Sequence, residues 1–142
     1  MSSMRVTGFS IAFLLGIAAL AQTEAVFRTR LSPVAMDATM RATVTGSGNV
    51  TARLTGSKLV VSGSFEGLLS NASLAQVHRS PVTGVRGPAI LDLTVTKAPG
   101  GTLSGSFDLS PEQLESLRAG KLYVQLHSDK APEGNLWGWL LP

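Results

Sequence analysis

Apolar and polar residues alternate along most of the chain in short runs, which is the pattern of β-strands. In residues 121–127, leucine and valine side chains fall on one face, and Tyr123, Gln125 and His127 fall on the other. Glycine, proline, serine and asparagine separate the runs at intervals of roughly ten residues. The runs cover residues 27–31, 38–45, 49–54, 58–66, 73–79, 89–96, 102–109, 121–127 and 135–141.

This spacing predicts an all-β fold, an antiparallel immunoglobulin-like or Greek-key β-sandwich or barrel of roughly eight or nine strands. Residues 38–45 and 49–54 are expected to form a hairpin around the turn Gly46-Ser47-Gly48. Residues 135–141 form the last strand of the chain. We expect this strand at a sheet edge, where it could pair with another chain.

One short helix, near Ser110–Ala119, is expected between the strands. Ser110 is a favourable N-cap, and Pro111 fits the first helical position. Gln113 completes a capping box with Ser110. Gly120 fits the left-handed position that commonly ends a helix.

The N-terminal segment, residues 1–21, has the features of a secretory signal peptide. A basic start precedes an apolar run at residues 8–20, which is shorter than the roughly 20 residues of a membrane-spanning helix. Ala19-Leu20-Ala21 supplies the small residues of a cleavage site, and an alternative cut follows Ala25. We therefore expect a secreted or periplasmic protein with one domain at residues 22–142. It would contact the membrane only through this segment, if the segment is not cleaved.

Charge and composition exclude several classes of function. The net charge of +3 is spread over scattered arginines and lysines, without the basic stripe of a nucleic-acid-binding protein. The sequence has no cysteine, which excludes disulfides, zinc fingers and thiol nucleophiles. No segment has the pattern of a nucleophile elbow, and we expect no catalytic activity.

Three segments resemble the CHRD domain, a family named for chordin and also found in exported bacterial proteins. They are Ala75-Gln76-Val77-His78-Arg79, residues 117–128 (LRAGKLYVQLHS) and Gly134-Asn135-Leu136-Trp137-Gly138. The resemblance extends over roughly Phe27 to Leu141. The chain departs from the family pattern at Gln76, where the family has the first histidine of a pair, and at Trp137, where it usually has arginine.

The resemblance implies an immunoglobulin-like or Greek-key β-sandwich and brings no agreed catalytic activity. In chordin, such domains belong to an extracellular antagonist of growth factors. For this chain, the resemblance implies a non-catalytic extracytoplasmic module for protein binding or surface assembly. Its expected partner is an extracytoplasmic protein or a cell-surface component.

His78 and His127 are the only histidines in the sequence. Alternation places each on the polar face of its strand, just before a loop. One interpretation makes them ligands of copper or zinc, with a carboxylate as a third ligand, in a small periplasmic or secreted metal-binding protein. The candidate carboxylates are Asp92, Asp129 and Glu133. The other interpretation, without a cofactor, is that each imidazole binds a backbone group and holds its loop in place.

Trp137 and Trp139 share one face of the last strand. Tryptophan buries a large area, so these side chains can pack in or against the core. Alternatively they form an exposed aromatic surface for a protein or glycan partner.

Overall fold

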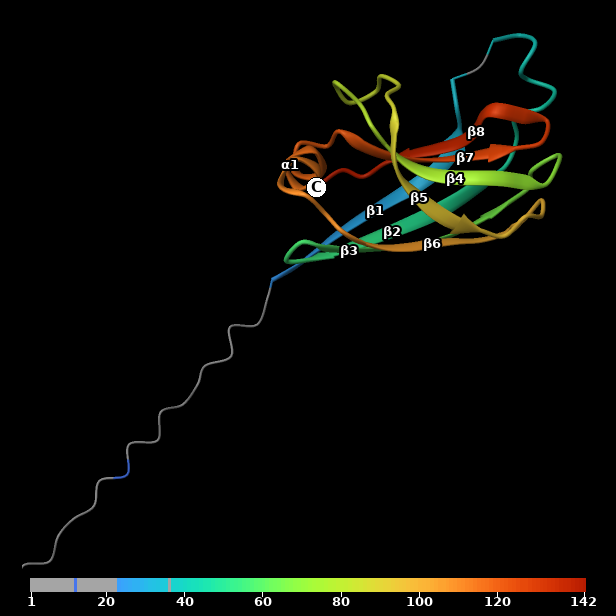
Figure 1. Cartoon of the computed structure of the whole chain (residues 1–142). Helices are drawn as coiled ribbons and strands as arrows, with labels where there is room; N and C mark the ends of the chain where they lie inside the picture. The colour runs from blue at the N-terminus through green and yellow to red at the C-terminus, as the bar shows by residue number, and fades with distance from the viewer. Residues whose placement is uncertain (1–11, 13–22, 36) are drawn as a thin grey trace, which may run out of the picture.

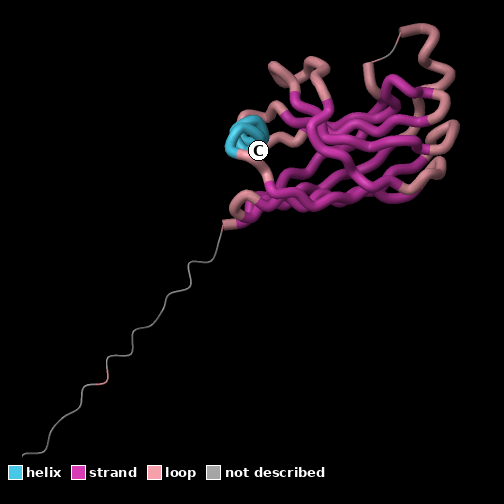
Figure 2. The backbone as a smooth tube through the Cα atoms, viewed as in Figure 1, coloured by secondary structure: helices cyan, strands magenta, loops and turns pink. Residues whose placement is uncertain are grey.

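The protein is an all-β domain, seen here in a computed structural model that describes residues 12, 23–35 and 37–142 (Figures 1 and 2). The signal peptide expected at residues 1–21 lies outside the described residues, apart from Ala12. The elements are β1 (Glu24–Pro33), β2 (Ser47–Thr55), β3 (Lys58–Glu66), β4 (Ala72–Arg79), β5 (Ala89–Val95), β6 (Gly101–Asp108), α1 (Pro111–Arg118), β7 (Leu122–Ser128) and β8 (Ala131–Trp139).

The strands form a closed antiparallel barrel in the order β1-β2-β3-β6-β5-β4-β7-β8. Strands β4, β5 and β6 follow one another through hairpins, and β3 lies beside β6, which is the Greek-key arrangement. The predicted fold class, an antiparallel β-sandwich or barrel with one short helix, is confirmed.

Two seams between the strands are short. β1 pairs with β8 only through Ser32–Trp137 and Pro33–Leu136, and β5 pairs with β6 only through two residue pairs. The barrel is therefore close to two sheets joined at two corners. Because β8 pairs with both β7 and β1, the prediction that the last strand is a free sheet edge is wrong. Closure gives β8 a neighbour on each side, which the sequence pattern could not show.

Leucine, valine and phenylalanine side chains fill the barrel interior, as the alternation predicts. The fully buried members include Leu31 on β1, Leu59 on β3, Leu103 on β6 and Leu126 on β7. The helix α1 covers one end of the barrel, close to the C-terminus (Figure 1). It contributes Leu117, which is fully buried, to the same core.

The predicted start of α1 is confirmed. Ser110 Oγ accepts a hydrogen bond from Gln113 N, and Gln113 Oε1 accepts one from Ser110 N. Gly120 has a φ of +71°, the left-handed conformation expected after the helix. No helix among the described residues has the length and apolarity needed to cross a membrane.

The predicted strand at residues 38–45 is wrong, and so is its hairpin with β2. These residues form turns, and β2 pairs with β1 and β3. The Asp37 carboxylate accepts hydrogen bonds from the backbone N–H groups of Thr39 and Met40 and from the Thr39 hydroxyl. This local bonding competes with strand pairing. The alternating Met40 and Val44 instead pack in a second, small cluster outside the barrel.

Candidate functional site

The outer face of β4, β7 and β8 carries a continuous group of rings, here called the aromatic cluster. Its members are His78, Tyr123, His127, Trp137 and Trp139. The His78 ring stacks on Tyr123 at 4.9 Å between centroids and on His127 at 6.2 Å. Tyr123 also contacts both tryptophans, at 5.8 Å and 4.6 Å. Two of these outward-facing side chains, His78 and Tyr123, are nevertheless buried, because other segments cover them.

The loop at residues 80–88 covers one side of the cluster, and Gly87 attaches it. His78 Nδ1 donates a hydrogen bond to Gly87 O at 2.9 Å, and the Tyr123 hydroxyl donates to the same oxygen at 3.1 Å. Gly87 N donates in return to the Tyr123 hydroxyl at 2.9 Å. Tyr123 is consequently 1% exposed and His78 is 8% exposed, although both point away from the barrel interior.

A second polar contact network lies at the other end of the cluster. His127 Nδ1 donates to Pro132 O at 2.9 Å, and Gln125 Nε2 donates to His127 Nε2 at 3.2 Å and to Glu133 O at 3.3 Å. Gly134 permits this close approach, because a Cβ there would lie 2.9 Å from Gln125 Nε2. Gln125 is thereby buried on the outer face of the barrel.

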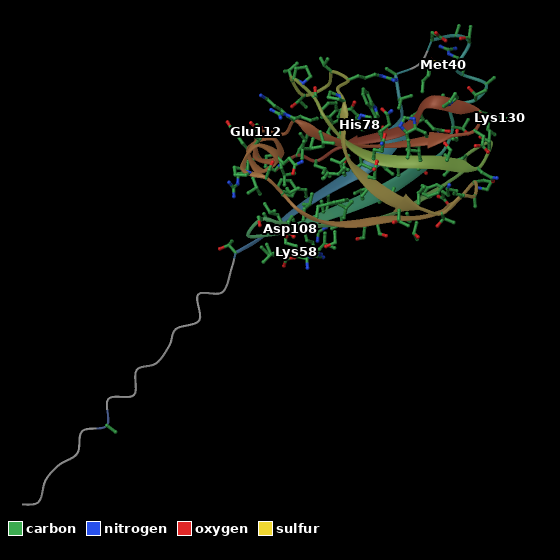
Figure 3. The ribbon with its side chains drawn as sticks, in the orientation of Figure 1. Met40, Lys58, His78, Asp108, Glu112 and Lys130 are labelled. Atoms are coloured by element: carbon green, nitrogen blue, oxygen red, sulfur yellow. The ribbon has the colours of Figure 1, made fainter. Side chains whose placement is uncertain are left out.

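Trp137 is covered from two sides. The guanidinium of Arg86, from the loop at residues 80–88, lies 5.9 Å from the Trp137 ring centroid and donates a hydrogen bond to Glu133 O at 3.1 Å. Met40, labelled in Figure 3, belongs to the turn segment and packs in the same small cluster as Trp137. Both tryptophans remain half-buried, so part of each ring faces solvent.

The hydrogen bonds assign the protons on the two histidines. Gly87 O and Pro132 O can only accept, so each neutral ring carries its proton on Nδ1 and a lone pair on Nε2. The pKa of His78 is lowered from its ordinary value of 6.5, chiefly because burial disfavours the charged ring. Proximity to His127 and Arg86 lowers this pKa further, while the bond to Gly87 opposes the shift.

Stability is expected to depend on pH through His78. Since the unfolded chain takes up a proton near pH 6.5 and the folded chain does so only at lower pH, the free energy of unfolding decreases as pH falls below 6.5. Above 6.5 this group contributes no pH dependence. Urea unfolding between about pH 8 and pH 5 measures the slope. His78→Phe keeps the ring and removes the titrating group, and an unchanged slope in that variant would assign the effect elsewhere.

The structure brings both candidate histidines and both candidate tryptophans into one cluster. The expected third ligand does not join them: Asp92 accepts a hydrogen bond from Gln76, and Glu133 and Asp129 are exposed. Over residues 23–35 and 37–142, no three His, Asp or Glu side chains are placed to hold a metal ion together.

Sequence reasoning missed Gln125, Arg86 and Gly87 as parts of the site. One feature of the sequence could have identified Gln125 as a site residue: it is the polar residue between Tyr123 and His127 on the outward face of β7. Nothing in the loop composition distinguishes Arg86 from the other scattered arginines.

The match to a family model places this architecture among known domains. The CHRD domain model matches residues 27–140, nearly the whole described chain. The chain therefore belongs to the CHRD domain family, which confirms the resemblance seen in the sequence. It is a non-enzymatic domain family whose members occur in extracellular and periplasmic proteins. Searches of curated proteins and of solved structures gave no match.

Proposed function

We propose that this protein is a non-catalytic, exported binding module that contacts an extracytoplasmic protein or a cell-surface component through the aromatic cluster and the loop beside it. The observation that carries this proposal is the presence of half-buried Trp137 and Trp139 beside Arg86 on one face. Tryptophan, tyrosine and arginine are the residues most enriched at the energetic centres of protein interfaces.

Exposed apolar residues in the loop at residues 80–88 also indicate that the face carrying the aromatic cluster is the contact surface. Val82 and Val85 are 56% and 47% exposed. The loop that carries them is fixed to the barrel by the hydrogen bond from Gly87 N to the Tyr123 hydroxyl. Apolar side chains held on a fixed loop lose little conformational freedom on binding. The rings of Trp137 and Trp139 meet at 66°, so they do not form one flat surface for a sugar ring. This geometry favours a protein partner.

Export is supported by the family, and the start of the fold distinguishes the two expected cleavage sites. The described structure has β1 beginning at Glu24, with Ala25 already paired to Leu54. Cleavage after Ala21 would leave this strand complete, whereas cleavage after Ala25 would remove its first residues. The first of the two possible sites is therefore the one we propose.

Site-specific photocrosslinking in the producing cells tests the proposal. A photoreactive residue at Val85 is expected to give a discrete adduct, and Trp139→Ala in the same chain is expected to reduce that adduct several-fold. Val60 is the matched control, because it is 42% exposed on β3, which lies opposite β7 in the barrel order. Equal adducts from Val60 and Val85, or an adduct that Trp139→Ala leaves unchanged, would contradict the proposed surface.

A second candidate function is the binding of copper or zinc by His78 and His127. One observation favours it: Nε2 of His78 is buried and has no hydrogen-bond partner.

A further inference from the structure

We propose that the aromatic cluster contains a site for one copper(I) ion, coordinated by Nε2 of His78 and Nε2 of His127, with the Gln125 side-chain amide as the adjustable third group. The inference rests on the second candidate function above and narrows it to one ion. Failure of the copper(I) titration would leave the proposed protein-binding surface untouched, because that surface is tested by crosslinking.

The first support is the orientation of the two imidazoles. Each ring uses Nδ1–H to bind a backbone carbonyl, Gly87 O for His78 and Pro132 O for His127. Metal-binding histidines are held in this way, with one nitrogen bound to a fixed acceptor and the other free to coordinate. The two carbonyls lie on separate segments, so both rings are positioned before any ion arrives.

The second support is a pair of buried acceptor atoms without partners. Among the described residues, His78 Nε2 and Gln125 Oε1 are the buried side-chain atoms that lack a hydrogen bond. Leaving such an atom unpaired costs about 1–3 kcal/mol. Both atoms have lone pairs, so a cation or a hydrogen-bond donor is the species that would satisfy them.

The positions of the rings bring His78, Gln125 and His127 together on one face of the barrel. The His78 ring contacts the rings of both Tyr123 and His127. Because Gln125 lies between these two residues on the same face of β7, the His78 ring lies beside it. His127 Nε2 is 3.2 Å from Gln125 Nε2 and completes the group. Rotation of the Gln125 amide about its terminal torsion, which has a broad energy minimum, would release His127 Nε2 for coordination.

The charge and the number of donors favour copper(I) over zinc. Zinc prefers four ligands, and no carboxylate of the described residues joins the two histidines. The Arg86 guanidinium donates to Glu133 O at 3.1 Å, and the same oxygen accepts from Gln125 Nε2 at 3.3 Å. A fixed positive charge therefore lies beside the site and disfavours a divalent ion more than a monovalent one. Copper(I) accepts low coordination numbers, and imidazole is among the ligands that bind copper.

Anaerobic titration of the full protein with copper(I), against a competing copper(I) chelator, tests the proposal, with zinc(II) titrated in parallel. We expect one copper(I) per chain. His78→Phe and His127→Phe should each weaken copper(I) binding by more than about tenfold. Gln125→Leu should also weaken copper(I) binding, but less than either histidine variant does. Val60→Ala, an exposed change on β3 across the barrel from β7, is the control variant and should bind as the unmodified protein does.

Nuclear magnetic resonance of the unmodified protein gives a readout that does not depend on the folding of a variant. Copper(I) should shift the Nε2 resonances of both histidines together, in proportion to the metal added. The absence of saturable copper(I) binding, binding that leaves either Nε2 resonance unmoved, or zinc binding that is tighter than copper(I) binding would each overturn the proposal.

Discussion

Replacing Gly87 with alanine is expected to detach the loop at residues 80–88 from the barrel and to lower the free energy of unfolding by about 3 kcal/mol or more. A Cβ at this position would overlap the carbonyl oxygen of Arg79 and lie 2.7 Å from its carbonyl carbon. Arg79 cannot move away easily, because its N–H donates to Pro88 O at 2.9 Å and its strand pairs with β7.

Detachment would leave His78 Nδ1 and the Tyr123 hydroxyl without their shared acceptor, and both groups are buried. Each unpaired group costs about 1–3 kcal/mol. Urea unfolding measures the loss. Val85→Ala, an exposed change in the same loop, should alter stability by no more than about 0.5 kcal/mol. If Gly87→Ala is equally mild, the loop is not held in the way described here.

Replacing Asn135 with alanine should be the second large loss, again of about 3 kcal/mol. Asn135 is fully buried and joins two segments: its Oδ1 accepts from Ser128 Oγ at 2.8 Å, and its Nδ2 donates to Thr45 O at 2.8 Å. Without the amide, the turn segment that precedes Thr45 loses a hydrogen bond that attaches it to β8. Because Met40 of that segment packs in the cluster that contains Trp137, tryptophan fluorescence should shift to longer wavelength.

Asn49→Ala provides the comparison for this variant, since Asn49 is exposed on β2. Its free energy of unfolding should stay within about 0.5 kcal/mol of the unmodified protein, and its fluorescence should not shift. A loss in Asn135→Ala without the fluorescence shift would mean that the turn segment stays in place by other contacts.

The sequence predicted the helices and strands correctly where interactions between residues close in sequence determine them. The capping box at Ser110 and Gln113 and the alternation in β3 both specify structure through neighbouring residues. The alternation in residues 38–45 predicted a strand that does not form. It reflects the packing of Met40 and Val44 against the outer side of β8, and not a place in the barrel. Closure of the barrel depends on pairing between β1 and β8, which are distant in sequence, and alternation carries no information about it.

The site was only half predictable for a related reason. Alternation placed His78 and His127 on the polar faces of their strands, which are normally solvated. It placed both tryptophans on one face of the last strand without deciding whether that face is buried or exposed. In the structure the loop at residues 80–88 covers Tyr123, and the segment around Glu133 and Gly134 covers Gln125, so both side chains are buried on that face. Each contact joins residues of different elements, and only the folded structure shows it.

The central claim is that backbone carbonyls of two loops fix both imidazoles with Nδ1 protonated and Nε2 unprotonated. Nitrogen-15 chemical shifts of the histidine side chains, recorded at about pH 8, measure this directly. We predict that His78 and His127 are both neutral Nδ1–H tautomers, with Nε2 resonances at unprotonated positions. An Nε2–H tautomer at either histidine would contradict the account.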